Sequence, residues 1–401
     1  MPNEIKPPYF HRKSVRPSHL YRDIGRSAER PFMILGTVLE TSLGDLIAKT
    51  VFLSTLKDQF DHARLIVRYS DLRPYSAEVI SLSPNIDHAT PLKGERPRWL
   101  AEWFPDMRPW LPLGRWTLGR EKMQPAFYDF VVVESMMDIR NLHGLGQPTL
   151  LRIPPEKEPL FHRQLVGLGL DPNRWYAALH YRTDSYGPKL TKSPLRNSEP
   201  DSYRDLASYI IDELGGQVVQ LGHPEMEPFP ARPGFIDLSR IREGFMLQAY
   251  AVSHSRFMVG GPSGPVTLAF AFDVPLGVVD ATDGYGGWGD GECVIQTHEV
   301  TTPDGRVLMN RALFESGLLD QVELKRQIRE GINHQIRKNN SAEVAAVARH
   351  LFDCTTDIRG WRTPRQRPER VRPNHFIWPP KTRENMRFLG EPAIRPPAES
   401  A

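Results

Sequence analysis

The feature that most constrains the fold is a buried strand that runs into a glycine-rich turn and then an apolar helix. Residues 256–282, RFMVGGPSGPVTLAFAFDVPLGVVDAT, predict a strand at 257–259, a helix over 263–272 and a second strand at 275–279. Ser263 suits a helix N-cap, and Pro265 suits the first turn, where an N–H has no intrahelical partner. This order is typical of a parallel sheet covered by helices.

The turn before this helix is also a candidate anion site. A helix N-terminus presents free N–H groups and roughly half a positive charge. Gly260, Gly261 and Gly264 would let a phosphate group approach the backbone closely. A capped helix behind a tight turn, without any ligand, is the alternative that the motif alone leaves open.

The alternation of strands and helices continues on the N-terminal side of this stretch. We expect a strand at 175–181, a helix at 202–214, a strand at 217–221 and a helix at 243–253. The order β-α-β-α-β-α-β predicts a doubly wound sheet, which binds ligands at the carboxyl ends of its strands.

That sheet edge should gather several basic and polar side chains. They are His180, Arg182, Lys192, Arg196 and Asn197, together with Ser263 and Gly264 of the turn. Guanidinium groups and backbone N–H groups both match phosphate oxygens, so their convergence predicts a diphosphate site. Any one of these residues alone would be interpreted as an ordinary surface residue. The prediction therefore depends on their lying close together at this edge.

The first half of the chain holds a second βαβ pattern. We expect a strand at 32–39, a loop at 40–44, a helix at 45–60 and a strand at 62–69. Asp45 follows the carboxyl end of the first strand. Its carboxylate either complements the helix dipole or acts as a general base toward a substrate hydroxyl.

Other segments give weaker signals. Residues 71–127 are rich in Trp and Pro and form either a cap over an acceptor site or an irregular packed segment. Strands are expected at 128–134 and 149–153, and a connecting helix at 158–170. From Glu315 onward a helical run is rich in Gln, Lys and Arg.

Charge is unevenly distributed along the 401 residues. The net charge of +3 combines +4 in residues 1–30 and +7 in residues 359–387, which leaves −8 for the body. A nucleic-acid-binding domain is not expected, because no basic stripe is interleaved with aromatic residues. The two basic, Pro-rich arms are either solvated tails or a peripheral contact with an anionic membrane surface.

Several classes of protein are disfavoured by missing motifs. No apolar run spans a bilayer, and two cysteines, Cys293 and Cys354, suit a reducing, cytoplasmic compartment. The sequence has no P-loop, no metal-ligand cluster and no G-x-S-x-G motif. We therefore expect neither a bound metal nor another cofactor, and neither a P-loop phosphotransferase nor a serine hydrolase.

Two separated stretches resemble bacterial heptosyltransferases. The first is TSLGDLIAKTVFLSTLKDQFDHARLIV at 41–67, and the second combines residues 180–225 with 257–284. The His-x-Arg pattern of His180 and Arg182 is similar to that of fucosyltransferases in the same GT-B superfamily. The combination resembles fucosyltransferase-like bacterial glycosyltransferases.

The resemblance implies the GT-B fold, an α/β architecture of two Rossmann-like domains facing each other across a cleft. It implies an acceptor domain at 31–155 and a nucleotide-sugar domain at 156–335, after a basic arm at 1–30. Residues 336–401 would hold a helix, at 341–351, that crosses back to the first domain, and then the basic tail.

The resemblance also implies a reaction. A hexosyl, fucosyl or heptosyl group would pass from a nucleotide-diphosphate sugar to a glycan or lipid-linked acceptor, with inversion and without a metal. Asp45 would be the base, Lys192 or Arg196 a phosphate contact, and Ser263 with Gly264 the turn that holds the diphosphate. The alternatives are a non-catalytic sugar-nucleotide or glycan-binding protein and a nucleotide-sugar epimerase.

Overall fold

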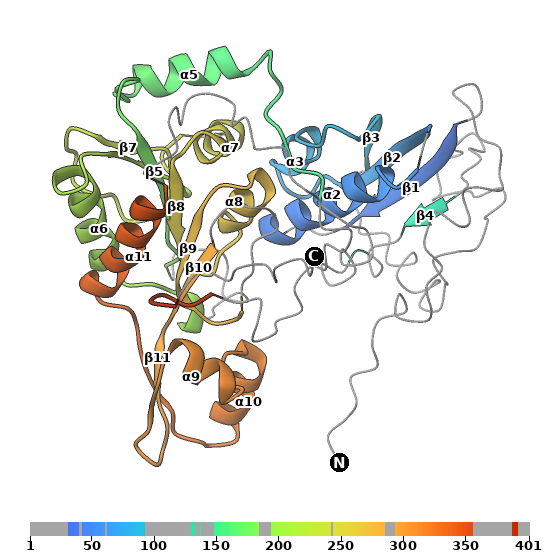
Figure 1. Ribbon diagram of the computed structural model, residues 1–401. Helices are drawn as coiled ribbons and strands as arrows, with labels where there is room; N and C mark the ends of the chain where they lie inside the picture. The colour runs from blue at the N-terminus through green and yellow to red at the C-terminus, as the bar shows by residue number, and fades with distance from the viewer. Residues whose placement is uncertain are drawn as a thin grey trace, which may run out of the picture. The chain divides into compact units, whose positions relative to one another are not determined.

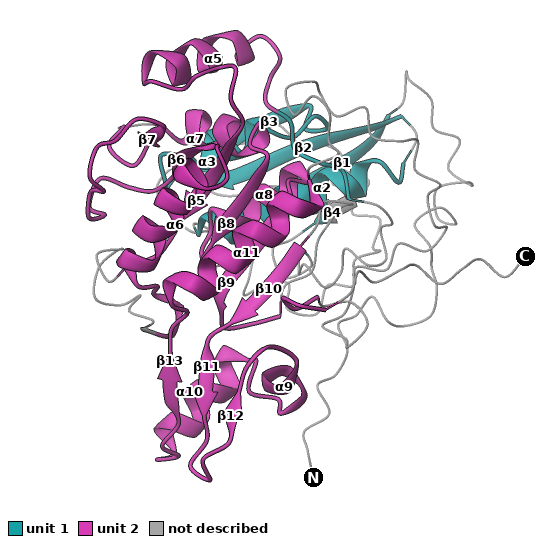
Figure 2. Cartoon of the chain, turned by 60° about the vertical axis from the view of Figure 1, so that its left-hand side comes forward, with its two compact units in different colours: residues 1–152, 370–378 teal, residues 153–369, 379–401 magenta. Residues whose placement is uncertain are grey.

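In the computed structural model, the chain folds into two compact α/β units. Unit 1 comprises residues 1–152 and 370–378, and unit 2 comprises residues 153–369 and 379–401 (Figure 2). The structure describes residues 31–39, 42–60, 62–92, 130–132, 137, 148–183, 194–241, 244–284, 293–355 and 387–391. Both basic arms therefore lie almost wholly outside the described residues.

Unit 1 is built on a parallel sheet with the strand order β3-β2-β1-β4. Its elements are β1 (Phe32–Val38), α2 (Leu43–Lys57), β2 (Ala63–Ser70), α3 (Ser76–Ser81), β3 (His88–Leu92) and β4 (Phe130–Val132). Helix α2 buries Leu46, Val51 and Leu53 against the sheet. The absence of a side chain on Gly36 makes room for Leu53, whose methyl carbons would lie 2.6 and 2.7 Å from an added Cβ. The predicted βαβ unit is confirmed.

Two predictions for this unit need correction. Helix α2 begins at Leu43 instead of Asp45, because Ser42 accepts the backbone N–H of Asp45 and caps the helix. Residues 149–153 form no strand; Leu151 and Ile153 are buried, but this stretch of chain joins no sheet. Of the Trp- and Pro-rich region, residues 93–127 lie outside the described residues.

Unit 2 contains a six-stranded parallel sheet with the order β10-β9-β8-β5-β6-β7. Its strands are β5 (Tyr176–His180), β6 (Gln217–Gln220), β7 (Phe235–Asp237), β8 (Phe257–Gly260), β9 (Leu276–Ala281) and β10 (Cys293–Thr297). From β5 the sheet grows one way to β7, and from β8 it grows the other way to β10. The direction of growth therefore reverses between β5 and β8, where His180 is in register with Gly260.

Helices cover both faces of this sheet, as Figures 1 and 2 show. One face carries α6 (Pro200–Asp212) and α11 (Ser341–Cys354), and the other carries α7 (Phe245–Ser253) and α8 (Val266–Phe272), while α5 (Glu158–Gly167) contacts α7. Leu206 and Ile210 of α6 and Val347 and Leu351 of α11 belong to one buried apolar cluster with the strands. The predicted doubly wound arrangement is confirmed.

The C-terminal helix packs on unit 2. Helix α11 contacts α6 and strands β8, β9 and β10 of that unit. Gly277 of β9 permits the contact, because a Cβ there would overlap the side chain of Val347. A capping box between Asn340 and Glu343 fixes the start of the helix.

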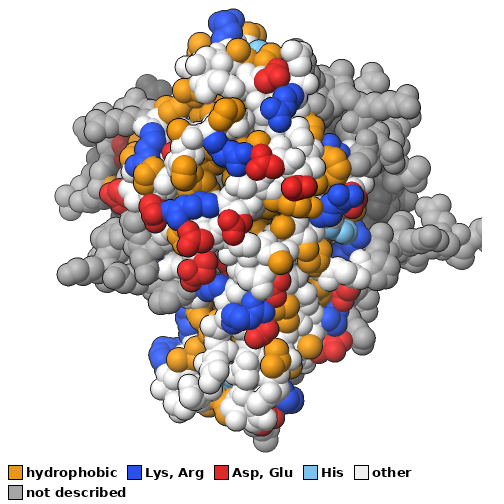
Figure 3. All heavy atoms as spheres, turned by 90° about the vertical axis from the view of Figure 1, so that its left-hand side faces the viewer, with side chains coloured by type: hydrophobic (Ala, Val, Ile, Leu, Met, Phe, Trp, Pro, Cys, Tyr) orange, Lys and Arg blue, Asp and Glu red, His pale blue; other side chains and the backbone are white. Residues whose placement is uncertain are grey.

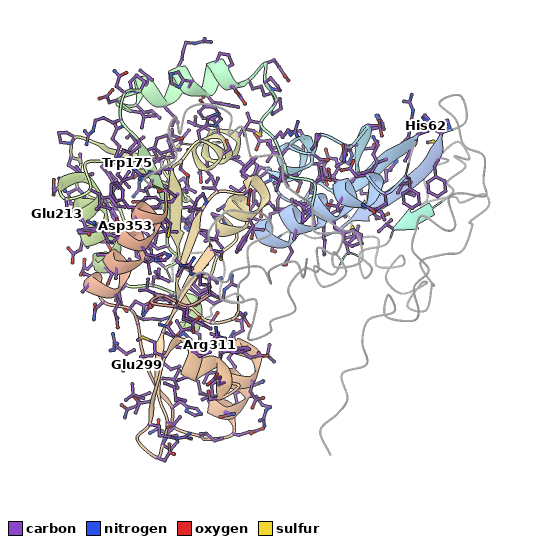
Figure 4. All side chains as sticks on the ribbon, in the orientation of Figure 1. His62, Trp175, Glu213, Glu299, Arg311 and Asp353 are labelled. Atoms are coloured by element: carbon purple, nitrogen blue, oxygen red, sulfur yellow. The ribbon has the colours of Figure 1, made fainter. Side chains whose placement is uncertain are left out.

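The segment after β10 adds a small subdomain, residues 299–337, which we call the lobe. It contains β11 (Glu299–Thr301), β12 (Val307–Leu308), α9 (Asn310–Glu315), α10 (Gln321–Arg329) and β13 (Gln335–Arg337). The strands form an antiparallel sheet in the order β12-β11-β13. Glu299 and Arg311, which Figure 4 labels on the lobe, make ion pairs with Arg337 and Glu391, each at 2.8 Å.

Acidic and basic side chains are intermixed on the face of unit 2 shown in Figure 3. Ion pairs include Arg204 with Glu227, Arg232 with Asp212, and Arg349 with Asp353. None of the helices in the described parts of the chain combines the length and the apolar character needed to cross a membrane.

Candidate functional site

His180 and Ser263 meet where the sheet of unit 2 reverses its direction of growth. Nε2 of His180 lies 2.8 Å from Oγ of Ser263, and Nδ1 lies 3.3 Å from the carbonyl oxygen of Leu221. A carbonyl oxygen can only accept, so Nδ1 carries the proton and Nε2 accepts the hydroxyl hydrogen of Ser263. Open α/β sheets bind their ligands at this kind of position.

Burial keeps the imidazole of His180 neutral. The side chain is 5% exposed, and burial lowers its pKa from 6.5 to about 4. The hydrogen bond to Leu221 raises this pKa, whereas the nearby His223 and Arg182 lower it. His180 is therefore a hydrogen-bond acceptor toward Ser263 at neutral pH.

Arg182 and Arg196 are brought to the same edge by the backbone. The carbonyl oxygen of Arg182 accepts from the N–H of Ser198 at 2.9 Å, which folds the segment after the 3₁₀ turn η5 (Pro194–Arg196) onto the end of β5. Nε of Arg196 donates to the carbonyl oxygen of Pro262 at 2.9 Å. Arg196 therefore contacts the turn that holds Ser263.

Asn197 lies, half-buried, between Arg196 and Ser198 on this segment. Nζ of Lys338 donates to the carbonyl oxygen of Leu195 at 2.5 Å, which fixes the segment from its other side. Lys192, the remaining predicted phosphate contact, lies outside the described residues. Six of the seven predicted binding residues are thus described, and all six belong to unit 2. They lie at or just after the end of β5, on or just after η5, and in the turn before α8.

The turn itself differs from the predicted helix start. Helix α8 begins at Val266 with Pro265 at the cap, so Ser263 is not the N-cap. Its hydroxyl binds His180 instead, and its carbonyl oxygen accepts from Val266 N–H at 3.3 Å. A helix of seven residues has a weak dipole, so side-chain cations must supply most of the positive potential at this edge.

Two glycines of the turn have a packing role. A Cβ on Gly260 would lie 2.6 Å from Cγ1 of Val266, and one on Gly261 would lie 2.8 Å from Oγ of Ser198. A larger residue at position 260 would collide with the start of α8, and one at position 261 would push the turn away from Ser198. The glycines are therefore explained by close packing, without any ligand.

A third cation, Lys325 of α10, was not anticipated from the sequence. Gln321 donates to Oδ2 of Asp283 at 2.8 Å, and Nζ of Lys325 donates to Oε1 of Gln321 at 3.2 Å. Asp283 lies two residues after β9, at the same sheet edge as His180. In the sequence Lys325 is one of several basic residues on a polar helix, so no local signal distinguishes it.

A buried pair behind the site fixes these loops. The backbone N–H of Asp280 donates to Oδ1 of Asn339, and the N–H of Asn339 donates to Oδ1 of Asp280, both at 2.7 Å. Asp280 holds a φ of 52°, which is uncommon outside glycine. The pair joins the end of β9 to the segment that carries Lys338, which in turn holds the η5 segment.

Asp45 lies in unit 1 on the first turn of α2, and its side chain is exposed. The hydroxyl of Ser42 donates to Oδ2 of Asp45 at 2.6 Å, and the Asp45 N–H donates back to that hydroxyl at 3.4 Å. These contacts give Asp45 a role in starting the helix.

No protein-family model and no curated protein matches the chain. Among solved structures, a glycosyl transferase family 9 protein from Veillonella parvula has a TM-score of 0.52 and 16% identity, over 80% of this chain and 97% of its own. The ADP-heptose LPS heptosyltransferase II of E. coli has a TM-score of 0.44 and 16% identity, over 75% and 100%. A UDP-GlcNAc 2-epimerase from Methanocaldococcus jannaschii has a TM-score of 0.34 and 9% identity, over 80% and 100%.

The chain therefore has the GT-B fold, the class that the two Rossmann-like units define. One protein with which it shares this fold is the Veillonella family 9 glycosyl transferase. This is the fold that the heptosyltransferase resemblance of the sequence implies. At 16% identity the similarity establishes the fold, whereas the reaction must be argued from the site.

Proposed function

We propose that the protein is a glycosyltransferase that uses a nucleotide-diphosphate sugar as its donor. The observation that supports this most is the convergence of His180, Arg182, Arg196 and the Ser263 turn at the point where the parallel sheet of unit 2 reverses. Basic side chains at such a point suit an anionic ligand.

The proposed chemistry is stabilisation of the departing nucleoside diphosphate. The guanidinium groups of Arg182 and Arg196 would bind the diphosphate oxygens, with Lys192, Asn197 and the Gly264 backbone as further contacts. Arg196 is held in place through Nε, which donates to Pro262, so its charge is preorganised next to the turn. Preorganised cations gain strength as negative charge develops on the leaving group.

Asp45 is the proposed general base of a single displacement that inverts the sugar configuration without a metal. Its carboxylate would take the proton from the acceptor hydroxyl as that oxygen attacks the anomeric carbon. The acceptor is proposed to be a glycan or lipid-linked sugar. The basic arms would then favour peripheral contact with the cytoplasmic membrane face.

Nucleotide binding tests the donor site directly. Isothermal titration of ADP, GDP and UDP should find one nucleoside diphosphate that binds the unaltered protein, and R196A should weaken its binding about ten-fold, as expected for a lost charge-assisted bond. R196K should not restore the affinity fully, because a lysine lacks Nε and the planar fork. R349A removes an exposed arginine that pairs with Asp353 on α11, and it should bind as the unaltered protein does.

Turnover separates the reaction classes. Incubation of UDP-, GDP- and ADP-sugars without an acceptor should release nucleoside diphosphate slowly if the protein is a transferase. An isomerised donor sugar would indicate an epimerase instead. Binding of the donor without turnover, whichever acceptor is added, would indicate a non-catalytic sugar-nucleotide-binding protein. Binding of no nucleoside diphosphate at all would exclude the proposed donor site.

A further inference from the structure

Helix α10 of the lobe is fixed to the edge of the large sheet at its first turn. Oδ1 of Asp320 accepts the N–H groups of Val322 and Glu323, at 2.8 and 3.2 Å, and so caps the helix. Asp320 also pairs with Asp283, just after β9, as an isolated antiparallel bridge. The start of α10 therefore has a defined position relative to the carboxyl end of β9.

A hydrogen-bonded row runs along one side of α10. Asp283 accepts from Gln321, and Gln321 accepts from Lys325 one turn further on. The two helix residues are four apart and share a face. Lys325 is half-buried, so its ammonium group is directed by this row and not by solvent alone.

Arg326, the neighbouring cation, has a different environment. It is 50% exposed and pairs with Glu323 and Glu330, each at 2.6 Å. Its charge is therefore neutralised locally by two carboxylates. Lys325 and Arg326 provide a matched pair of cations, one beside the site and one on the solvent side of the same helix.

The surroundings of Lys325 are dominated by like charges. Burial lowers its pKa, the positive charges of Arg196, Arg182 and Arg329 lower it further, and Asp283 raises it. Among the described residues, the charged groups that shift the pKa of Lys325 are thus three cations and one carboxylate. A gathering of like charges is unfavourable in the ligand-free protein and becomes favourable when an anion binds among them.

We infer that Lys325 contacts the diphosphate of the donor as a third cation, which makes the lobe a part of the nucleotide-sugar site. The inference rests on the proposed function, because it uses the site formed by Arg182, Arg196 and the Ser263 turn. Gln321 is the positioning residue, since it joins the ammonium group of Lys325 to the end of β9.

Titrations with pyrophosphate and with the preferred nucleoside diphosphate test the inference. Pyrophosphate isolates the contribution of the diphosphate, because it carries neither base nor sugar. K325A should weaken both ligands about ten-fold, the loss expected for one charge-assisted contact. K325R should retain most of the affinity. R326A should bind both ligands with an affinity within about two-fold of the unaltered protein, because the charge of Arg326 is screened by solvent and paired with two carboxylates.

The outcomes distinguish this inference from the proposed function. Suppose that the unaltered protein binds ADP, GDP or UDP, and that K325A binds pyrophosphate and the nucleoside diphosphate with the same affinity as R326A does. The lobe is then not part of the site, while the proposed function stands. If no nucleoside diphosphate binds the unaltered protein, both fail. Thermal unfolding of K325A and Q321M checks the fold: weaker binding at an unchanged Tm supports contact with the ligand, and a lowered Tm with unchanged affinity assigns Lys325 a purely structural role.

Discussion

The 2.8 Å hydrogen bond between His180 and Ser263 joins two residues that are far apart in the sequence, across the point where the sheet of unit 2 changes direction. Because Nδ1 of His180 donates to Leu221, the neutral imidazole must accept the hydroxyl hydrogen of Ser263. In this state the oxygen of Ser263 has no hydrogen to offer to a phosphate. For Ser263 to donate to an anion while His180 keeps its hydrogen bonds to both Leu221 and Ser263, His180 must take up a proton and become the donor.

Binding of the preferred nucleoside diphosphate should therefore be accompanied by proton uptake. The pKa of His180 is about 4 in the free protein, and an anion beside the pair would raise it. Calorimetry at one pH in buffers with different ionisation enthalpies measures the protons taken up. S263A should bind with less proton uptake than the unaltered protein.

The charge of His223 also lowers the pKa of His180, so the effect of His223 on proton uptake must be tested separately. H223Q should retain most of the proton uptake, because the link runs through Ser263. Equal uptake in the unaltered protein and in S263A would show that the His180–Ser263 pair does not change its protonation on binding.

Acid should destabilise the protein through its buried histidines. His298 is fully buried, and burial, followed by the charge of Lys338, lowers its pKa to about 4. Between pH values of about 6.5 and 4 the unfolded chain binds a proton at this residue that the folded protein does not. The free energy of unfolding should therefore decrease as the pH is lowered through this window, by up to about 1.4 kcal/mol per pH unit for each such histidine.

Urea unfolding at pH 7.0, 6.0 and 5.0 measures that slope. H298Q should give a shallower dependence on pH than the unaltered protein, even if it is less stable at pH 7.0. H162Q, which removes an exposed histidine of α5, is the matched control. Parallel curves for H298Q and the unaltered protein would contradict the assignment.

Asp45→Asn should separate catalysis from helix capping. If Asp45 is the base, D45N lowers turnover by about 10²–10⁴-fold, the usual size of a general-base contribution, and leaves the dissociation constant of the nucleoside diphosphate unchanged. S42A removes the cap that Ser42 provides and should lower Tm while it preserves most of the turnover. A D45N protein that transfers sugar at an unaltered rate would limit Asp45 to capping.

Gly277→Ala tests the packing of α11 on unit 2. The added methyl group would overlap the side chain of Val347, so we expect a loss of about 1–3 kcal/mol in the free energy of unfolding. The second substitution V347A should recover part of this loss, because it vacates the space. Chemical denaturation of the single and double variants measures the coupling, and additive effects would show that the two positions do not touch.

Local sequence pattern determined most of the secondary structure. The alternating apolar runs, and glycines and prolines between them, were sufficient to place β1, α2, β5, α6, β8 and β9 to within a few residues. The order of these elements also predicted parallel sheets, since strands joined through helices pair in parallel. The edge at which His180, Arg182 and Arg196 gather followed from that order.

Only the tertiary structure decided which groups interact there. Ser263 looked like a helix cap because capping residues are recognised locally, yet its hydroxyl binds His180, on another strand. Residues 149–153 are apolar enough for a strand, but they pair with none of the strands in the described residues. Helix α11 packs at Gly277, where an added Cβ would overlap Val347. Lys325 became a candidate only when the lobe placed α10 beside β9, because contacts between distant segments depend on packing that no local pattern encodes.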